Sequence, residues 1–228
     1  MSGWLRRRSA LDRVLAAVLL VAALPVIAVL VLVVRATSPG RALIRLPRVG
    51  RYGRRFGMWK LRTMRAGSGG RAPGAPLTAL DDPRVTAVGR FLRRSRLDEL
   101  PQLLNVLCGD MALIGPRPET PEYVDTDDPR WTCVLQARPG LAGPTQVLVH
   151  GIEGSVLARG GEDAYRTELL PAKLAIDAWY LRHASAGVDL LVVAGVVQEL
   201  LLRRRAALER RVHGAVPEAR GLAYRSVP

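Results

Sequence analysis

The sequence predicts an α+β fold that is mostly helical. We expect a long N-terminal membrane helix interrupted at Pro25, followed by a compact domain with a small β-hairpin and amphipathic interfacial helices. Three observations support this prediction: a long uncharged run at 14–34, short apolar stretches flanking a Gly/Arg-rich turn at 42–62, and helical apolar periodicity further along the chain.

The length and composition narrow the classes of protein. A chain of 228 residues can form one sizeable domain plus an accessory segment, which we divide into a membrane segment at 1–38, the main domain at 39–205 and a basic tail at 206–228. The net charge of +14 favours anionic partners. Aromatic residues make up only 5% of the chain and no nucleic-acid-binding motif is present, so phosphates and membranes are favoured over nucleic acid. Two cysteines in unrelated contexts fit a reducing cytosol.

The run at 14–34 contains 21 uncharged residues, enough for a helix to cross roughly 30 Å of hydrocarbon. It is too long for the core of a cleaved signal peptide and lacks a clean cleavage site. Pro25 in its middle removes a backbone hydrogen bond. The flanking arginines are balanced, so the positive-inside rule gives no orientation: Arg6, Arg7, Arg8 and Arg13 precede the run, and Arg35, Arg41, Arg45 and Arg48 follow it. These residues leave two topologies open, a helix–break–helix on the cytoplasmic face or a kinked single span.

The next elements are read from periodicity and from turn residues. We expect the hairpin at 42–62, a loop at 66–80 and then a helix with Val88, Phe91 and Leu92 on one side. After Ser95 a second helix is predicted, which Gly109 ends. Its apolar face consists of Leu97, Leu100, Leu103, Leu104 and Leu107.

Further along, "LIGPRPET" and "ARPGLAGPTQV" are typical of loops held by proline and glycine. Residues 162–183 are predicted to be helical. The apolar stretch at 188–202 is too short to span a bilayer, and it could lie in the headgroup interface or form a core helix.

The candidate chemistry rests on two adjacent acids, Asp98 and Glu99, since the sequence has no phosphate-binding glycine loop, no zinc-protease motif and no serine-hydrolase motif. Neighbouring residues on a helix point about 100° apart, so this pair suits two different roles, such as a nucleophile and a metal ligand. Aspartate can attack phosphorus, and Mg²⁺ binds one or two carboxylates together with substrate phosphates. Upstream cations could neutralise a pyrophosphate: Lys60, Arg62, Arg84 and Arg93. A lone acid pair is, however, more often a helix cap or a solvated surface.

Three segments resemble a known family, the bacterial sugar transferases, which are monotopic phosphoglycosyl transferases: "FGMWKLRTM" (56–64), "DDPRVTAVGRFLRRSRLDELPQLLNVLCGDMALIGPRPE" (81–119) and "ARPGLAGPTQV" (137–147). Asp177, Tyr180, Ser185 and Asp189 also keep the spacing of a further family segment. The resemblance covers roughly residues 10 to 202. The chain departs from the family at Arg96, where many members read serine before L-D-E-L.

The resemblance implies an activity. Such enzymes move sugar-1-phosphate from a UDP-sugar to undecaprenyl phosphate and release UMP, in the first membrane step of polysaccharide or glycoconjugate assembly. It implies that Asp98 attacks the sugar-linked phosphorus and that Glu99 holds Mg²⁺, which makes 39–205 the catalytic domain. The predicted substrate-binding residues lie in the resembling segments: Lys60, Arg62, Arg84, Arg93, Arg117, Arg138, Gln146 and Asp177.

The resemblance also implies a location and partners. Family members insert a re-entrant helix broken near a proline, which favours re-entrance here and places the catalytic domain on the cytoplasmic face of the bacterial inner membrane. Expected partners are the UDP-sugar, undecaprenyl phosphate and the bilayer, without nucleic acid, and a homodimer stays open. The alternatives are a non-catalytic membrane-bound scaffold of the same fold and a membrane-tethered nucleic-acid binder.

Overall fold

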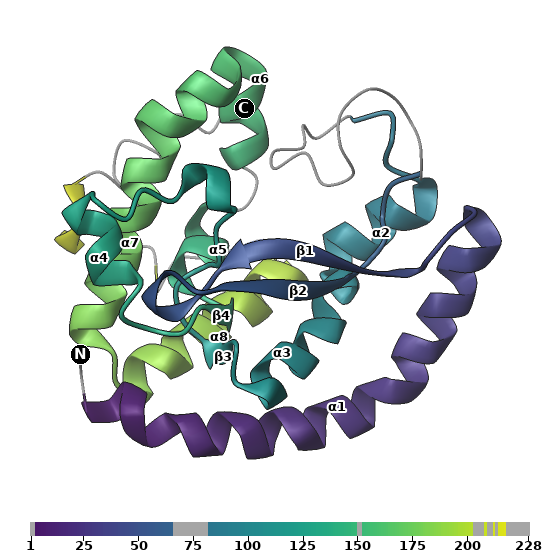
Figure 1. Cartoon of the computed structure of the whole chain (residues 1–228), viewed down its shortest axis with the longest axis horizontal. Helices are drawn as coiled ribbons and strands as arrows, with labels where there is room; N and C mark the ends of the chain where they lie inside the picture. The colour runs from purple at the N-terminus through teal and green to yellow at the C-terminus, as the bar shows by residue number, and fades with distance from the viewer. Residues whose placement is uncertain are drawn as a thin grey trace.

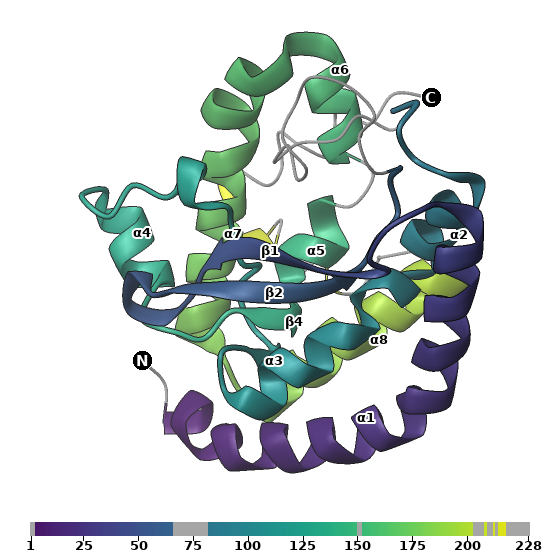
Figure 2. The same ribbon diagram turned by 45° about the vertical axis from the view of Figure 1, so that its right-hand side comes forward.

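The computed structural model describes residues 3–65, 82–149 and 152–202, together with residues 208, 212 and 214–217. Within these residues the chain is mostly helical and carries two small sheets of two strands each, which confirms the predicted mostly helical α+β class (Figures 1 and 2). The re-entrant membrane topology stays a prediction. The loop predicted at 66–80 and most of the predicted tail at 206–228 lie outside the described residues.

The N-terminal segment forms one helix, α1 (Gly3–Thr37), with Pro25 inside it. The predicted break is instead a bend, because the helix continues on both sides of the proline. Figures 1 and 2 show α1 turning through a large angle along its course, and proline is the usual cause of such sharp bends. Among the described residues, α1 is the one helix long and apolar enough to cross a membrane.

The two faces of α1 differ in what they contact. Buried Ala16, Leu20 and Ile27 follow helical spacing and pack in one cluster with Val106 and Met111. The most apolar window of α1 has a mean hydropathy of 3.2, yet only 6% of it is buried within the molecule. Large apolar side chains therefore face outward: Leu11, Val14, Leu15, Val18, Leu19, Val21, Leu24, Val26, Val29, Leu32 and Val33.

The predicted hairpin is confirmed. Strands β1 (Leu43–Val49) and β2 (Arg55–Leu61) pair antiparallel, with Leu43 opposite Leu61. The turn between them, η1 (Arg51–Gly53), places Tyr52 at φ 58° and Gly53 at φ 74°, and the left-handed region suits the glycine better than the tyrosine.

The segment carrying the two acids begins with helix α2 (Ala87–Ser95), capped by Thr86. Within α2, Leu92 is fully buried, whereas Phe91, predicted on the same apolar side, is 60% exposed. The residue after α2, Arg96, has a left-handed φ of 55° and stops the helix.

The predicted second helix starts as a 3₁₀ turn, η2 (Leu97–Gln102), and becomes α-helical only in α3 (Leu103–Cys108). Pro101 lies inside the 3₁₀ turn, and Gly109 ends α3 at φ 86°, as the sequence indicated. Asn105 attaches α3 to the edge of β2: its Oδ1 accepts the Trp59 N–H at 2.9 Å and its Nδ2 donates to the Gly57 carbonyl at 2.9 Å. This attachment brings the two acids beside β2.

The two segments predicted as loops pair with each other over a short distance. Strands β3 (Ala112–Ile114) and β4 (Gly140–Ala142) are parallel neighbours. A Cβ at Gly140 would lie 2.1 Å from the backbone nitrogen of Gly115, so this approach requires glycine. Three short helical elements follow β3 along the chain: η3 (Pro121–Tyr123) and α4 (Pro129–Val134) precede β4, and α5 (Pro144–Val149) comes after it.

The C-terminal half is helical, as predicted for 162–183. Helix α6 (Ile152–Ala164) continues through a π-helical turn, η4 (Tyr165–Leu169), into α7 (Leu170–His183). The largest core cluster surrounds α7, with Tyr165 and Tyr180 fully buried.

Helix α8 (Ala186–Leu202) confirms the core-helix alternative on one of its faces, and its position in a headgroup interface stays a prediction. Val188 and Val192 are buried in the main core, so one face belongs to the domain interior. The other face exposes large apolar side chains: Leu190, Val193, Val197 and Leu200.

Candidate active site

The two acids, Asp98 and Glu99, lie together against a lysine from the hairpin. Lys60 Nζ on β2 is 3.0 Å from Asp98 Oδ2 and 3.6 Å from Glu99 Oε1. Asp98 is almost completely buried, at 2% exposure. The Lys60 ammonium therefore faces both carboxylates and can offset the negative charge of the two adjacent acids.

A second cation reaches Glu99 from the loop after β3. Arg117 Nη2 is 3.8 Å from Glu99 Oε1. The site is thus assembled from three separate parts of the fold: strand β2, the 3₁₀ turn η2 and the β3–η3 loop.

The surroundings act differently on the two carboxylates. Burial raises the pKa of Asp98 above its ordinary value, and the Glu99 charge adds to this, while Lys60 opposes it. Burial would also raise the pKa of Glu99, but Lys60 and Arg117 overcome it and hold that pKa below its ordinary value. Neighbouring acids with pKa values moved in opposite directions are suited to different roles.

Arg93 on α2 is the third cation that acts on the pair. Its Nε donates to Thr63 Oγ1 at 2.9 Å. Burial lowers the pKa of Arg93, and the Asp98 charge opposes that shift. The structure therefore brings together five of the predicted site residues: Asp98, Glu99, Lys60, Arg93 and Arg117.

Two of the predicted cations are engaged elsewhere. Arg62 is buried, and its Nη2 donates to the Ser38 carbonyl at 2.6 Å and to Ser38 Oγ at 2.8 Å, which ties β2 to the end of α1. Arg84 forms an ion pair with Asp82 at 2.6 Å. No contact of either guanidinium with Asp98 or Glu99 is found in the described part of the chain.

Asp177 and Gln146 interact with Arg117 and Arg96, respectively, which are neighbours of the acid pair. Asp177 on α7 is buried, accepts a hydrogen bond from Thr145 Oγ1 and interacts with the backbone N–H of Arg117. Burial raises its pKa to about 7. Gln146 Nε2 donates to the Leu141 carbonyl at 2.8 Å, while its buried Oε1 has no hydrogen-bond partner among the described residues. The remaining predicted residue, Arg138, lines a separate pocket.

Sequence reasoning missed a buried cluster next to the Arg117 loop. Glu119 Oε2 accepts from Lys173 Nζ at 2.7 Å and from Tyr165 OH at 2.6 Å. Burial alone would raise the pKa of Glu119, but Lys173 and these hydrogen bonds lower it to about 2. Lys173 is one of only two lysines in an arginine-rich chain, and that rarity was the available signal.

A second missed network connects the two ends of the fold. The Arg8 guanidinium on α1 pairs with Asp189 on α8, donates to Tyr180 OH at 3.0 Å and donates to the Ile114 carbonyl. Ile114 lies three residues before Arg117. From the sequence, Arg8 was interpreted only as a flanking charge of the membrane segment, whereas the spacing shared with the family singled out Tyr180 and Asp189.

The donor set of the acid pair fits Mg²⁺. The buried Oδ2 of Asp98 has the Lys60 ammonium as its neighbour and no other hydrogen-bond partner among the described residues. Glu99 adds a second carboxylate on the adjacent residue. The described residues contain no group of three or more metal-ligating side chains, and Mg²⁺ characteristically uses one or two carboxylates and takes its other ligands from water and phosphate.

Comparison with known proteins identifies the family. The family model described as bacterial sugar transferase matches residues 4–203, which is most of the chain. The chain therefore belongs to the bacterial sugar transferase family, a family of transferases.

Three relatives show how far the similarity extends. The chain is 40% identical over 198 residues to a UDP-glucose:undecaprenyl-phosphate glucose-1-phosphate transferase of Caulobacter vibrioides, covering 86% of this chain and 70% of that protein. It is 36% identical to a UDP-N-acetylgalactosamine-undecaprenyl-phosphate N-acetylgalactosaminephosphotransferase of Aeromonas hydrophila, over 78% of this chain and 39% of that protein. It is 31% identical to an Escherichia coli UDP-glucose:undecaprenyl-phosphate glucose-1-phosphate transferase, over 80% of this chain and 37% of the relative. The chain thus spans well under half of the last two proteins.

Proposed function

We propose that this chain transfers sugar-1-phosphate from a UDP-sugar to undecaprenyl phosphate through a covalent phosphosugar intermediate on Asp98. The observation that carries the proposal is the buried Asp98–Glu99 pair facing Lys60, with Arg117 beside Glu99 and Arg93 acting on Asp98. The names of the Caulobacter, Aeromonas and Escherichia relatives support the donor and acceptor classes.

The first step breaks the diphosphate of the donor. An Asp98 carboxylate oxygen attacks the phosphorus that bears the sugar, the bond to the bridging oxygen breaks, and UMP leaves with that oxygen and the electron pair. Lys60 and Arg93 offset the negative charge that gathers around the phosphoryl oxygens. The product of this step is an acyl phosphate that joins Asp98 to the sugar-1-phosphate.

The second step restores the enzyme. A phosphate oxygen of undecaprenyl phosphate attacks the same phosphorus, and the Asp98 carboxylate departs with its oxygen. The products are undecaprenyl-diphosphate-sugar and free enzyme. Since Asp98 must be ionised to attack and its pKa is raised by burial, the first step should slow as acidity protonates it.

Glu99, whose pKa is held low, would hold Mg²⁺ with help from Asp98 and the donor phosphates. When bound, the ion would neutralise the departing diphosphate charge. The orientation of the Glu99 carboxylate is maintained in the protein by Lys60 and Arg117.

The proposed setting is the cytoplasmic face of the bacterial inner membrane, with α1 entering and leaving on the same side. The bend in α1, the Pro25 within it and the balanced arginine flanks support this topology. The outward apolar face of α8 would be a second surface in contact with lipid.

The test uses purified full-length protein with UDP-sugar and Mg²⁺ but without undecaprenyl phosphate. A candidate panel should include UDP-glucose and UDP-N-acetylgalactosamine. We expect a burst of about one UMP per active site and a sugar-phosphate adduct on the peptide containing Asp98, because the first step needs no acceptor. Asp98→Asn should abolish both, since an amide is a poor nucleophile.

The matched control is Asp128→Asn, which makes the same substitution at the half-buried cap of α4 and should leave the burst unchanged, because asparagine caps nearly as well as aspartate. A folded Asp98→Asn protein that still releases a full burst of UMP would exclude the covalent route.

A further inference from the structure

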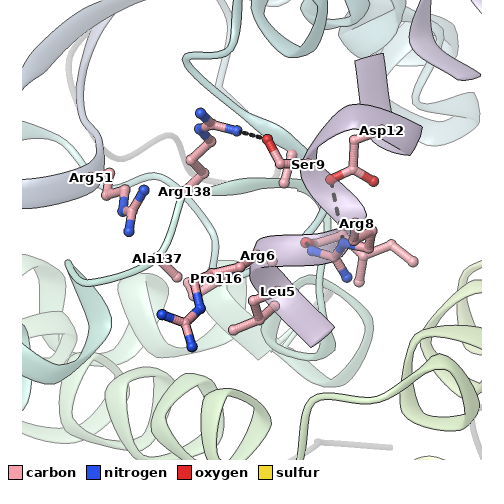
Figure 3. Close-up of a pocket in the computed structure, with 12 residues that line it drawn as sticks. Leu5, Arg6, Arg8, Ser9, Asp12, Arg51, Pro116, Ala137 and Arg138 are labelled. Carbon is pink, nitrogen blue, oxygen red and sulfur yellow. Dashed lines mark hydrogen bonds and ion pairs between the residues drawn. The ribbon is translucent and has the colours of Figure 1, made fainter. Parts of the chain in front are cut away.

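A second cationic pocket lies apart from the acid pair. Its cavity of about 200 Å³ is lined by the first turns of α1, by the hairpin turn and by the segments around β3 and β4. Figure 3 shows the guanidinium groups of Arg6, Arg51 and Arg138 arranged around this space, with Arg8 and Asp12 along α1. Neither Asp98 nor Glu99 lines it.

The positive charge of the pocket exceeds its acids. Arg8 is already paired with Asp12 at 3.3 Å and with Asp189. Arg6 makes no hydrogen bond or ion pair with any residue that the structure describes. Arg138 donates to Ser9 Oγ.

Arg138 also experiences repulsion from its neighbours. Burial lowers the pKa of its guanidinium, and the charges of Arg13 and Arg51 lower it further, against the smaller opposite effects of Asp12 and Asp110. An anion in the cavity would relieve this repulsion. Planar guanidinium groups suit phosphate oxygens in particular.

The pocket lies at the polar end of the apolar helix. The outward apolar face of α1 begins at Leu11, and a helix rises about 7.5 Å over the five residues from Arg6 to Leu11. This is the depth over which lipid headgroups give way to acyl chains. If the apolar face that begins at Leu11 contacts the hydrocarbon chain of a lipid, the phosphate of that lipid would lie at the cationic pocket.

We propose that this pocket binds the phosphate group of a membrane lipid, at a site distinct from the acid pair. One loop connects the pocket to the acid pair: Gly115 and Pro116 line the pocket, and the next residue, Arg117, is 3.8 Å from Glu99. A phosphate held by Arg6 and Arg138 would brace this loop. The proposal adds a binding site to the function proposed above, and its test needs no turnover.

The experiment measures lipid retention directly. Full-length protein in a non-ionic detergent is titrated separately with undecaprenyl phosphate, phosphatidylglycerol and inorganic phosphate, and native mass spectrometry quantifies the bound species. We expect one tightly bound lipid per chain. Arg6→Gln and Arg138→Gln should each weaken its binding about fivefold, which corresponds to about 1 kcal/mol for one cation near lipid phosphate.

Arg7→Gln is the matched control, because Arg7 is exposed on the same helix and does not line the pocket. Its substitution changes the net charge by the same amount as the other two. It should bind lipid as the wild type does. If the Arg6 and Arg138 substitutions weaken the binding of undecaprenyl phosphate alone, the occupant of the pocket is the acceptor phosphate. If they weaken the binding of phosphatidylglycerol equally, the pocket binds lipid phosphate in general. Equal effects of all three substitutions, no retained lipid in the wild type, or binding of inorganic phosphate alone would overturn the proposal. If a variant that no longer retains lipid keeps its UMP burst, the lipid pocket and the acid pair function independently.

Discussion

Adjacent residues in one 3₁₀ turn acquire different properties from what surrounds them. Asp98 is buried with Lys60 as its close cation, whereas Glu99 is near both Lys60 and Arg117. The pKa of the first is raised and that of the second is lowered. The sequence identified both acids, but the opposite shifts depend on Lys60 and Arg117, which approach from elements that are distant along the chain.

Glu99→Gln tests the metal role at this scale. The substitution keeps the size of the side chain and removes its charge, so Mg²⁺ should bind poorly and turnover should fall by orders of magnitude. Isothermal titration with Mg²⁺ in the presence of UDP, alongside steady-state UMP release, measures both effects. Unchanged Mg²⁺ affinity in this variant, or normal wild-type turnover in excess chelator, would remove Glu99 from the metal site.

Arg96 is a departure from the family pattern for which the structure supplies a partner. It has a left-handed φ of 55° immediately before the turn that carries the acids. Its Nη2 is 3.2 Å from Glu199 Oε2 on α8 and donates to the Gln146 carbonyl at 3.1 Å. The side chain therefore anchors the backbone at this left-handed position.

A double-substitution cycle tests this anchoring role. Arg96→Gln and Glu199→Gln should each lower the free energy of unfolding by ~1–3 kcal/mol, because each removes the ion pair between two largely buried side chains. The double variant should lose less than the sum, by more than ~0.5 kcal/mol. Since the Arg96 charge also lowers the pKa of Glu99, Arg96→Gln should raise that pKa, which NMR titration of the Glu99 carboxyl group would report. Additive losses and an unchanged Glu99 pKa would contradict the assignment.

At the scale of elements, local patterns predicted structure where local contacts decide it. The hairpin was found because its apolar stretches and its turn are close in sequence, and its strands pair from Leu43 to Leu61. The turn η2 was predicted as α-helix because its leucines keep helical spacing, which does not reveal the left-handed Arg96. Strands β3 and β4 pair residues 112 and 140, which are distant along the chain. Each strand taken alone therefore has the local sequence pattern of a loop.

The topology of α1 is the prediction that belongs to this scale. In a variant with Cys108 and Cys133 replaced by serine, single cysteines at Gly3 and Pro39 flank the helix; Pro39 is exposed, unlike Ser38, which is buried against Arg62. If α1 enters and leaves on one side, a membrane-impermeant maleimide should label neither site in intact cells and both after permeabilisation. Labelling of one end from outside would establish a spanning helix.

At the scale of the whole molecule, one buried acid joins helices to the active-site loop. Asp177 on α7 contacts Thr145 on α5 and the Arg117 backbone, and burial raises its pKa from 3.8 to about 7. Between these two values the folded protein keeps a proton that the unfolded chain has lost. Stability therefore falls as the pH rises through this window, and the full cost is present above pH 7.

Asp177→Asn should remove that part of the pH dependence. The amide cannot ionise, and its oxygen can still accept the Thr145 hydrogen bond, so the variant should unfold at a higher temperature than wild type at pH 8 and at a similar one near pH 4. Thermal unfolding of both proteins in the same detergent across this range measures the difference. Parallel curves for the two proteins would show that Asp177 stays ionised throughout.

The contact between Arg8 and Asp189 imposes an order on synthesis and folding. The two residues are 181 positions apart, and at translation rates of 5–20 residues per second their emergence from the ribosome is separated by roughly 10–40 s. During that time the first turns of α1 have no counter-ion from α8, and the Arg8 guanidinium must stay hydrated. The N-terminal helix can therefore complete its docking only after α8 has been synthesised, so a nascent chain truncated before α8 should retain a solvent-accessible N-terminus.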